Sequence, residues 1–355
     1  MTKKSNQDTK KGLSQAKESS SKYDITNYTT QSESAQSDKA QDEKLPTVRS
    51  VQSKILISPN DKLTHAVFGC DKKLQTQELF TQSEDEFIEI RTDARGKITI
   101  LANLSGLPKN LQSKLGDRFT RAVCDSITSL KLSGNDFITP EIIAFAMNGY
   151  ENRRTTDKFI EQIKETVEIL SHTWCIIDAG EEAKARGYHF EKTFFKGILI
   201  PVDTVEGVFI DGRCVTAYKI LREPILYKYA KQKGQFLTID NRIIQFPNPD
   251  GKKRVNMTRE NVILQRYLIE RIAGMKNHKN KLSNVINYET IFEILNAQEF
   301  SKIEKKRIRD RVKTFLDNWV KLGFIASYLE GTTKGTRGRL IENISISLKT
   351  KKSKE

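Results

Sequence analysis

The stretch SKIEKKRIRDRVKTFLDNWVKL, at residues 301–322, decides how the C-terminal part of the chain is read. Its large apolar residues recur at spacings of four, seven, eight and eleven: Ile308, Val312, Phe315, Leu316 and Trp319. These spacings place the five side chains on one face of an α-helix. The pattern predicts a long helix from about Ser301 to Leu322 with one buried side.

A second face of the same helix is basic. Its cations fall at spacings of four, seven and eleven: Lys302, Lys306, Arg309 and Lys313. Four cations in line repel one another, and a phosphate backbone or the acceptor edges of a DNA groove would offset that repulsion. The alternative is a solvated surface eased by the acids Glu304, Asp310 and Asp317. Those acids lie mostly off the line of cations, which favours a nucleic-acid surface.

The segment after this helix predicts a basic hairpin. Strands are expected at 324–329 and 340–348, and GTTKGTRGR at 331–339 separates them. Lys334, Arg337 and Arg339 would then stand at the hairpin tip, within reach of a phosphate line or the minor groove. Taken alone, the loop is equally compatible with a flexible polar connection. Beside a basic helix it is typical of the wing of a winged helix. Residues 301–355 hold fifteen Lys and Arg against six Asp and Glu, a net +9 of the chain's +15.

Outward from this segment, the same order of elements is predicted twice. A helix, a short helix, a long helix and then strands are expected within 111–246 and again within 258–348, joined by a linker at 247–257. In the first module the strands are placed at 174–177, 194–200, 207–210 and 214–220. Apolar alternation at 86–91 and 97–101, around a turn at 93–96, predicts a hairpin inside a lead-in at 56–110. The duplication is one of pattern only.

The long helix of the first module has a different charge. Its exposed positions are expected to include Asp157, Glu161, Glu165 and Glu168, a poor surface for a DNA groove. Only Arg153, Arg154 and Lys158, at its N-terminal end, are placed to meet phosphate. The second module is therefore expected to read DNA, and the first to offer a partner surface with some backbone contacts.

The two ends of the chain have tail-like compositions. Residues 1–55 are rich in Lys, Ser, Gln, Thr and Asp and contain no Phe or Trp, so they cannot bury enough apolar surface to offset their chain entropy. They are expected to form a disordered, mildly basic arm that either touches DNA non-specifically or is inert. Residues 349–355 form a short basic tail.

Several classes of protein are excluded. No apolar run approaches the roughly 18–20 residues of a membrane span, and a polar stretch follows the basic N-terminus where a signal peptide would be apolar. The four cysteines and four histidines are scattered, without the spacing of a zinc site. No GxxxxGK[ST], GxSxG or HExxH occurs. We expect a cytoplasmic protein that is not an enzyme and needs no cofactor or metal.

The arrangement resembles the winged-helix replication initiators of plasmids and related mobile elements in Gram-positive bacteria. The resemblance covers about residues 110–348 and is carried by patterns at 156–171, 223–230, 267–272 and 307–325. It implies an α+β fold of tandem winged-helix modules behind a disordered N-terminal tail. It also implies an initiator that binds double-stranded origin DNA without chemistry of its own, recruits host replication proteins and often forms a homodimer.

Two other functions remain open at this stage. The chain could regulate transcription, as a phage-type repressor does, in which case a divergent operon with one palindrome is expected in place of repeats beside a partition gene. A scaffold that binds an acidic protein through the basic helix is the second alternative. Replacement of Lys306, Arg309 and Lys313 by Ala is expected to weaken DNA binding sharply with little change in stability.

Overall fold

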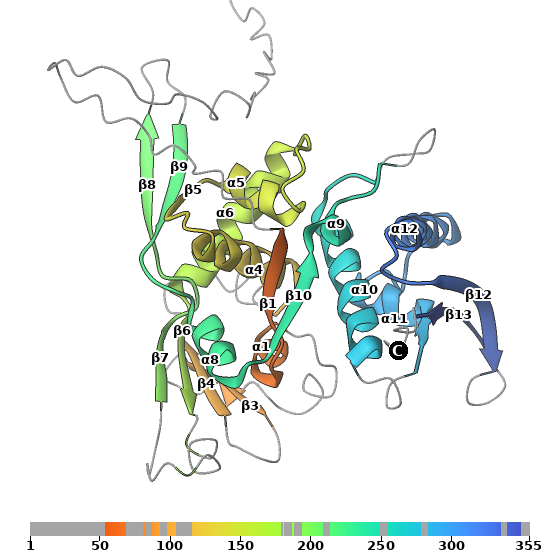
Figure 1. Ribbon diagram of the computed structural model, residues 1–355, viewed down its shortest axis with the longest axis horizontal. Helices are drawn as coiled ribbons and strands as arrows, with labels where there is room; N and C mark the ends of the chain where they lie inside the picture. The colour runs from red at the N-terminus through yellow and green to blue at the C-terminus, as the bar shows by residue number, and fades with distance from the viewer. Residues whose placement is uncertain are drawn as a thin grey trace, which may run out of the picture. The chain divides into compact units, whose positions relative to one another are not determined.

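The computed structural model describes residues 54–68, 81–82, 87–92, 98–103, 116–178, 180, 187, 194–208, 214–248, 255–277, 283–334 and 339–348 (Figure 1). Contacts divide the chain into residues 1–50 and 51–355, and every described residue belongs to the second part. The expected N-terminal arm therefore lies almost entirely outside the described residues. The same holds for the expected turns at 93–96 and 211–212 and for the tail at 349–355.

The C-terminal half contains three helices and a three-stranded sheet. In chain order these are α10 (Arg259–Asn277), β11 (Val285–Asn287), α11 (Tyr288–Ile294), α12 (Lys302–Lys321), β12 (Ser327–Lys334) and β13 (Leu340–Ser347). The strands are antiparallel, in the order β11-β13-β12. A capping box of Ser301 and Glu304 starts α12, and its expected apolar face is buried. Strand β12 begins three residues later than predicted, because residues after α12 first turn back onto the helix.

The preceding segment repeats this order. It runs α4 (Arg118–Leu132), β5 (Phe137–Ile138), α5 (Pro140–Met147), α6 (Asp157–His172), β8 (Val202–Val208) and β9 (Cys214–Ile220). The strand order β5-β9-β8 has the same connectivity as β11-β13-β12. Asp117, Thr139 and Thr156 cap the three helices by accepting backbone N–H groups. The two halves thus share one topology, in which a short strand after the first helix pairs with the last strand.

Two strands of the first half belong elsewhere. β6 (Trp174–Asp178) and β7 (Phe194–Ile198) are inserted between α6 and β8. They join β2 (Thr81–Gln82), β3 (Phe87–Thr92) and β4 (Ile98–Asn103) in a sheet of order β2-β3-β4-β6-β7. The expected hairpin of β3 and β4 is confirmed. The strands at 174–177 and 194–200 follow α6 in the chain, as expected. Their assignment to the sheet of the first module is wrong, because β6 pairs with β4 of the lead-in and with β7.

Regular structure also begins earlier than the sequence indicated. Strand β1 (Ile55–Pro59) and helix α1 (Lys62–Val67) precede the hairpin expected from residue 86, and β1 includes Ile55, the last residue of the expected disordered arm. β1 pairs antiparallel with β10 (Phe236–Asp240), and its Ile57 N–H donates to Ser129 Oγ on α4 at 3.2 Å. A five-residue strand with a distant partner has no local pattern that distinguishes it from a tail.

The core continues from the first half into the second. Helix α8 (Ile225–Lys233) leads into β10 and the short α9 (Asn241–Ile244), and α4 packs against α10. The indole Nε1–H of Trp319 on α12 donates to the Ile243 carbonyl at 2.9 Å. Phe246, Val255 and Met257, at the two ends of the expected linker, are buried. The chain is therefore packed where it enters and leaves residues 249–254, which lie outside the description.

Charged side chains are buried where α4 meets α10. Arg121 lies 3.2 Å from Glu270 and 4.0 Å from Asp125, and Arg118 lies 3.0 Å from Glu270. Burial raises the pKa of Asp125 to about 6, although Arg121 and Arg266 act in the opposite direction. These contacts tie the first helix of one half to the first helix of the other.

No helix in the described part of the chain is long and apolar enough to cross a membrane. The same residues hold no group of three His, Cys, Asp or Glu side chains arranged to bind a metal ion. Cys124 and Cys175 are buried and Cys214 is exposed, while Cys70 lies outside the description.

Candidate nucleic-acid interface

The expected basic face of α12 divides into two pairs of residues. Lys302 and Lys306, in the first two turns, are exposed, and no carboxylate of the described residues pairs with them. Arg307 is exposed beside them. A cation near a helix N-terminus opposes the helix dipole. The sequence therefore places unneutralised positive charge where the helix itself disfavours it.

Arg309 points toward the rest of its own module. Its guanidinium pairs with Glu342 on β13 and lies over the rings of Tyr288 and Phe292, 5.5 and 5.4 Å from their centroids. Its side chain is 27% exposed. Removal of this side chain would also remove packing between α12, α11 and the sheet. The expectation that its replacement leaves stability nearly unchanged does not fit these contacts.

Lys313 is held by the hairpin. Its Nζ lies 2.7 Å from Glu330 Oε2 on β12, and Tyr288 Oη–H donates to Glu330 Oε1 at 2.7 Å. Burial alone would raise the pKa of Glu330, but the bonds from Lys313 and Tyr288 outweigh it and lower that pKa. Tyr328 Oη–H, also on β12, donates to Asp317 Oδ1 on α12 at 2.7 Å. Side chains therefore fix the hairpin against the helix.

The described end of the hairpin carries two of the three expected cations. Lys334 ends β12 and is exposed, opposite Leu340, which is 63% exposed. Arg339 is 77% exposed and its NH2 lies 2.8 Å from Glu289 Oε1 on α11. Arg337 lies outside the described residues. The described end of the hairpin thus presents positive charge beside the exposed side chain of Leu340.

The three cations proposed for the first half are placed differently from one another. Arg153 NH1 donates to the Phe246 carbonyl at 2.7 Å, and the guanidinium lies 5.7 Å from the Phe246 ring centroid. Through these contacts Arg153 holds Phe246, in the segment that follows α9. Arg154 and Lys158 are exposed at the start of α6. Only these two are free of the packing that holds Arg153.

The remainder of α6 is acidic, as the sequence indicated. Asp157, Glu161 and Glu168 are exposed and Glu165 is half-buried. Burial and then the charges of Glu141, Glu161, Glu168 and Glu206 raise the pKa of Tyr218 on β9. Four carboxylates from α5, α6 and β8 therefore act electrostatically on one tyrosine. This half presents negative charge where the second half presents positive charge.

Sequence reasoning missed the carboxylates that pair with the basic side chains. Glu330, Glu342 and Glu289 come from β12, β13 and α11, and none lies on α12. The one available signal was alternation along the hairpin, since Glu330 and Thr332 share a face and Thr332 pairs with Glu342. That signal is readable only after the register of the two strands is known.

No family model and no curated protein matches this chain. One solved structure that is similar to it is described as the crystal structure of Pi initiator protein in complex with iteron DNA. The TM-score is 0.32 and the identity 12%, over 65% of this chain and 93% of that one.

Proposed function

We propose that the two repeated units are winged-helix modules and that the second binds double-stranded DNA sequence-specifically. The repeated topology supports the first part: three helices, a short strand after the first helix, and a hairpin whose last strand pairs with it. In this reading α12 is the recognition helix and β12–β13 is the wing. α6 and β8–β9 occupy the corresponding positions of the first module.

One observation carries the DNA-binding proposal. Lys302 and Lys306 are exposed without a described carboxylate partner at the N-terminal end of a helix whose apolar face is buried. In helix-turn-helix proteins the N-terminal residues of the recognition helix contact base edges in the major groove. Lys334 on the wing would meet phosphates to one side, and Arg339 would do so by exchanging Glu289 for phosphate.

The paired cations of α12 would take a second role. Arg309 and Lys313 already have carboxylate partners, so contact with phosphate requires exchange of one anion for another. We propose that they position α12 on the wing, and that Lys302 and Lys306 supply most of the attraction to DNA. Glu330 and Glu342 then moderate non-specific binding by keeping part of the positive charge neutralised.

The first module would contribute little to DNA affinity. Its acidic α6 would be repelled by phosphate, and only Arg154 and Lys158 are placed for backbone contacts. We propose that its exposed face meets a protein partner, and that the whole chain initiates replication of a plasmid or mobile element in the cytoplasm. It would do so by binding origin DNA and recruiting host replication proteins, without chemistry of its own.

Fluorescence anisotropy with the full chain tests this function. We would titrate duplexes from the DNA flanking its own gene, and random duplexes of equal length, at two salt concentrations. Locus-preferring affinity with a log–log salt slope of roughly −4 to −5 is expected for about five neutralised phosphates. Equal affinity for both duplexes would overturn sequence-specific binding.

A matched pair of variants locates the surface. Lys302→Ala with Lys306→Ala should weaken binding and make the salt slope shallower by about 2. Lys54→Ala with Lys228→Ala removes two exposed lysines elsewhere on the chain and should change binding far less. If both double variants bind equally, the net charge of the chain and not α12 determines its affinity.

A further inference from the structure

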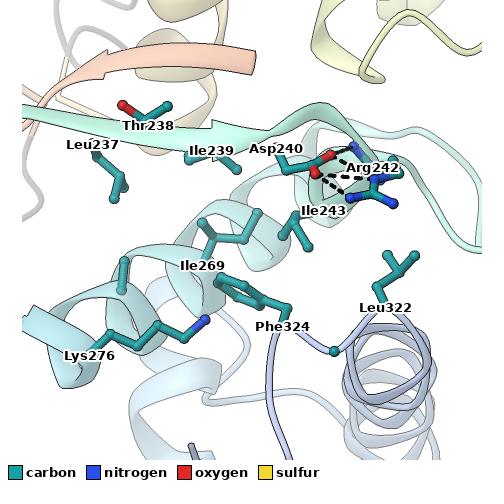
Figure 2. A pocket seen from close by; sticks show the side chains of 12 residues that line it. Leu237, Thr238, Ile239, Asp240, Arg242, Ile243, Ile269, Lys276, Leu322 and Phe324 are labelled. Carbon is teal, nitrogen blue, oxygen red and sulfur yellow. Dashed lines mark hydrogen bonds and ion pairs between the residues drawn. The ribbon is translucent and has the colours of Figure 1, made fainter. Parts of the chain in front are cut away.

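A cavity of about 300 Å³ lies where β10 and α9 face the ends of α10 and α12 (Figure 2). Its apolar wall is built by Leu237, Ile239, Ile243, Ile269 and Leu322, and its polar part by Thr238, Asp240, Arg242 and Lys276. This volume is at the lower end of the range of small-molecule sites, which are largely apolar with few polar groups. The cavity is separate from the basic face of α12 and from the wing tip.

A lysine side chain reaches into this space, in addition to Arg242 at its edge. Lys276, near the C-terminus of α10, places Nζ 3.6 Å from the centroid of the Phe324 ring, and Figure 2 shows that amine directed into the cavity. Lys276 has no ion-pair partner among the described residues, and no charged neighbour contributes to its pKa. Burial alone lowers that pKa to about 8.

The carboxylate that lines the cavity does not neutralise Lys276. Asp240 is engaged by Arg242, whose Nε lies 3.0 and 3.1 Å from its two oxygens and whose NH2 lies 2.6 Å from Oδ2. This pairing with Arg242 lowers the pKa of Asp240. The ring of Phe324 is therefore the nearest described attraction for the ammonium. Asp240, the carboxylate among the lining residues, is already neutralised by Arg242.

We propose that this cavity binds a small organic monoanion, a carboxylate on an unbranched apolar chain, with the carboxylate on Lys276 and the chain against the apolar wall. A desolvated ammonium gains most from an anion that brings no other charge. At the roughly 30 Å³ that a water molecule occupies in the liquid, the space holds about ten waters, and octanoate has about as many non-hydrogen atoms.

The proposal stands whether or not the chain binds DNA. It has a consequence for α12, because Leu322, Gly323 and Phe324 line the cavity at the point where α12 ends and the chain turns toward β12. A bound carboxylate would join this turn to β10 and α10. Any ligand effect on DNA affinity would then be a second, separate measurement.

Isothermal titration calorimetry of the full chain, without DNA, tests the site. The probes are octanoate, the isosteric neutral octanamide and the cation octylamine. Octanoate is expected to bind at least tenfold more tightly than octanamide, and octylamine not at all. Titrations in two buffers of different ionisation enthalpy measure the protons taken up by the protein on binding. Because a bound anion raises the Lys276 pKa, octanoate binding should be accompanied by uptake of as much as about half a proton at pH 8 and almost none at pH 6.5.

Two variants make the outcome specific. Lys276→Met should abolish the preference for octanoate over octanamide and the proton uptake, while the exposed Lys228→Met should leave both unchanged. Ala273→Leu, which fills the cavity while Lys276 remains, should weaken octanoate and octanamide alike. The proposal is overturned if octanoate does not bind, if octanamide binds as tightly, or if Lys276→Met binds octanoate as the wild type does.

Discussion

The ammonium of Lys313 on α12 lies 2.7 Å from Glu330 on β12, and the same carboxylate accepts a hydrogen bond from Tyr288 on α11. One glutamate thus joins the three elements nearest the proposed DNA surface. Both members of the ion pair are more than a third exposed, so the pair contributes no more than about 1 kcal/mol to stability. Its larger effect is on the charge that α12 and the wing present.

Glu330→Gln should therefore raise affinity for DNA. The amide can still accept the Tyr288 hydrogen bond, but Lys313 is released and one negative charge is removed. Non-specific duplex binding at low salt is expected to strengthen by about three- to tenfold, and the gain should fade as salt screens the charges. Anisotropy with random duplex measures this. Glu161→Gln on α6 is the control, and an equal gain there would show that only net charge matters.

Arg309→Ala should destabilise the protein more than Lys306→Ala. Arg309 covers the Tyr288 and Phe292 rings and pairs with Glu342, so its loss should cost about 1–2 kcal/mol of unfolding free energy. Lys306 is exposed, and its replacement should stay within about 0.5 kcal/mol. Urea denaturation followed by circular dichroism compares the two. Equal stabilities would place Arg309 in solvent, contrary to its contacts here.

Trp319→Phe should weaken the junction between α12 and α9. The substitution keeps an aromatic ring but removes the Nε1–H that donates to the buried Ile243 carbonyl at 2.9 Å. A buried carbonyl left without its donor costs about 1–3 kcal/mol. Thermal unfolding should show a lower midpoint with DNA specificity retained. A variant as stable as the wild type would mean that water replaces the lost donor.

Lys276→Met should stabilise the protein at neutral pH. The folded-state pKa of Lys276 is lowered to about 8, so below pH 8 folding carries the full cost of desolvating its charge. As pH rises from 8 toward 10.5 the unfolded chain holds more protons than the folded one, and wild-type stability recovers. Allowing for a half-buried side chain, the variant should gain about 1–2 kcal/mol at pH 7. The gain should shrink toward pH 10. If the variant gains the same unfolding free energy at pH 7 and pH 10, the gain comes from packing and not from the removed charge.

The helices of both halves could be predicted because their signals are local. Thr139 and Thr156 precede helices α5 and α6 in sequence, and each accepts a backbone N–H three residues on. The buried face of α12 followed from spacing alone. Periodicity and capping act within one or two turns, so a single sequence contains them.

Sheet membership and ion pairing could not be predicted in the same way. Nothing in residues 174–178 shows that β6 pairs with β4 and β7 and not with β9, because the choice depends on partners far away in sequence. The division of the basic face of α12 into paired and unpaired cations also depends on residues far away in sequence. Lys302 and Lys313 look alike on a helical wheel, and only the placement of Glu330 on the wing separates them.

Strand β1 cannot pair with β10 until the ribosome has synthesised β10, which lies far downstream in the chain. About 180 residues separate Pro59 from Asp240, and at roughly 5–20 residues per second a ribosome needs about 10–40 s to make them. During that interval Ile55–Pro59 is an unpaired strand whose nearest early contact is Ser129 on α4. A nascent chain that stalls before residue 236 therefore exposes an unpaired strand edge that can pair with other chains. The speed of translation through the first module should influence the fraction of the protein that aggregates.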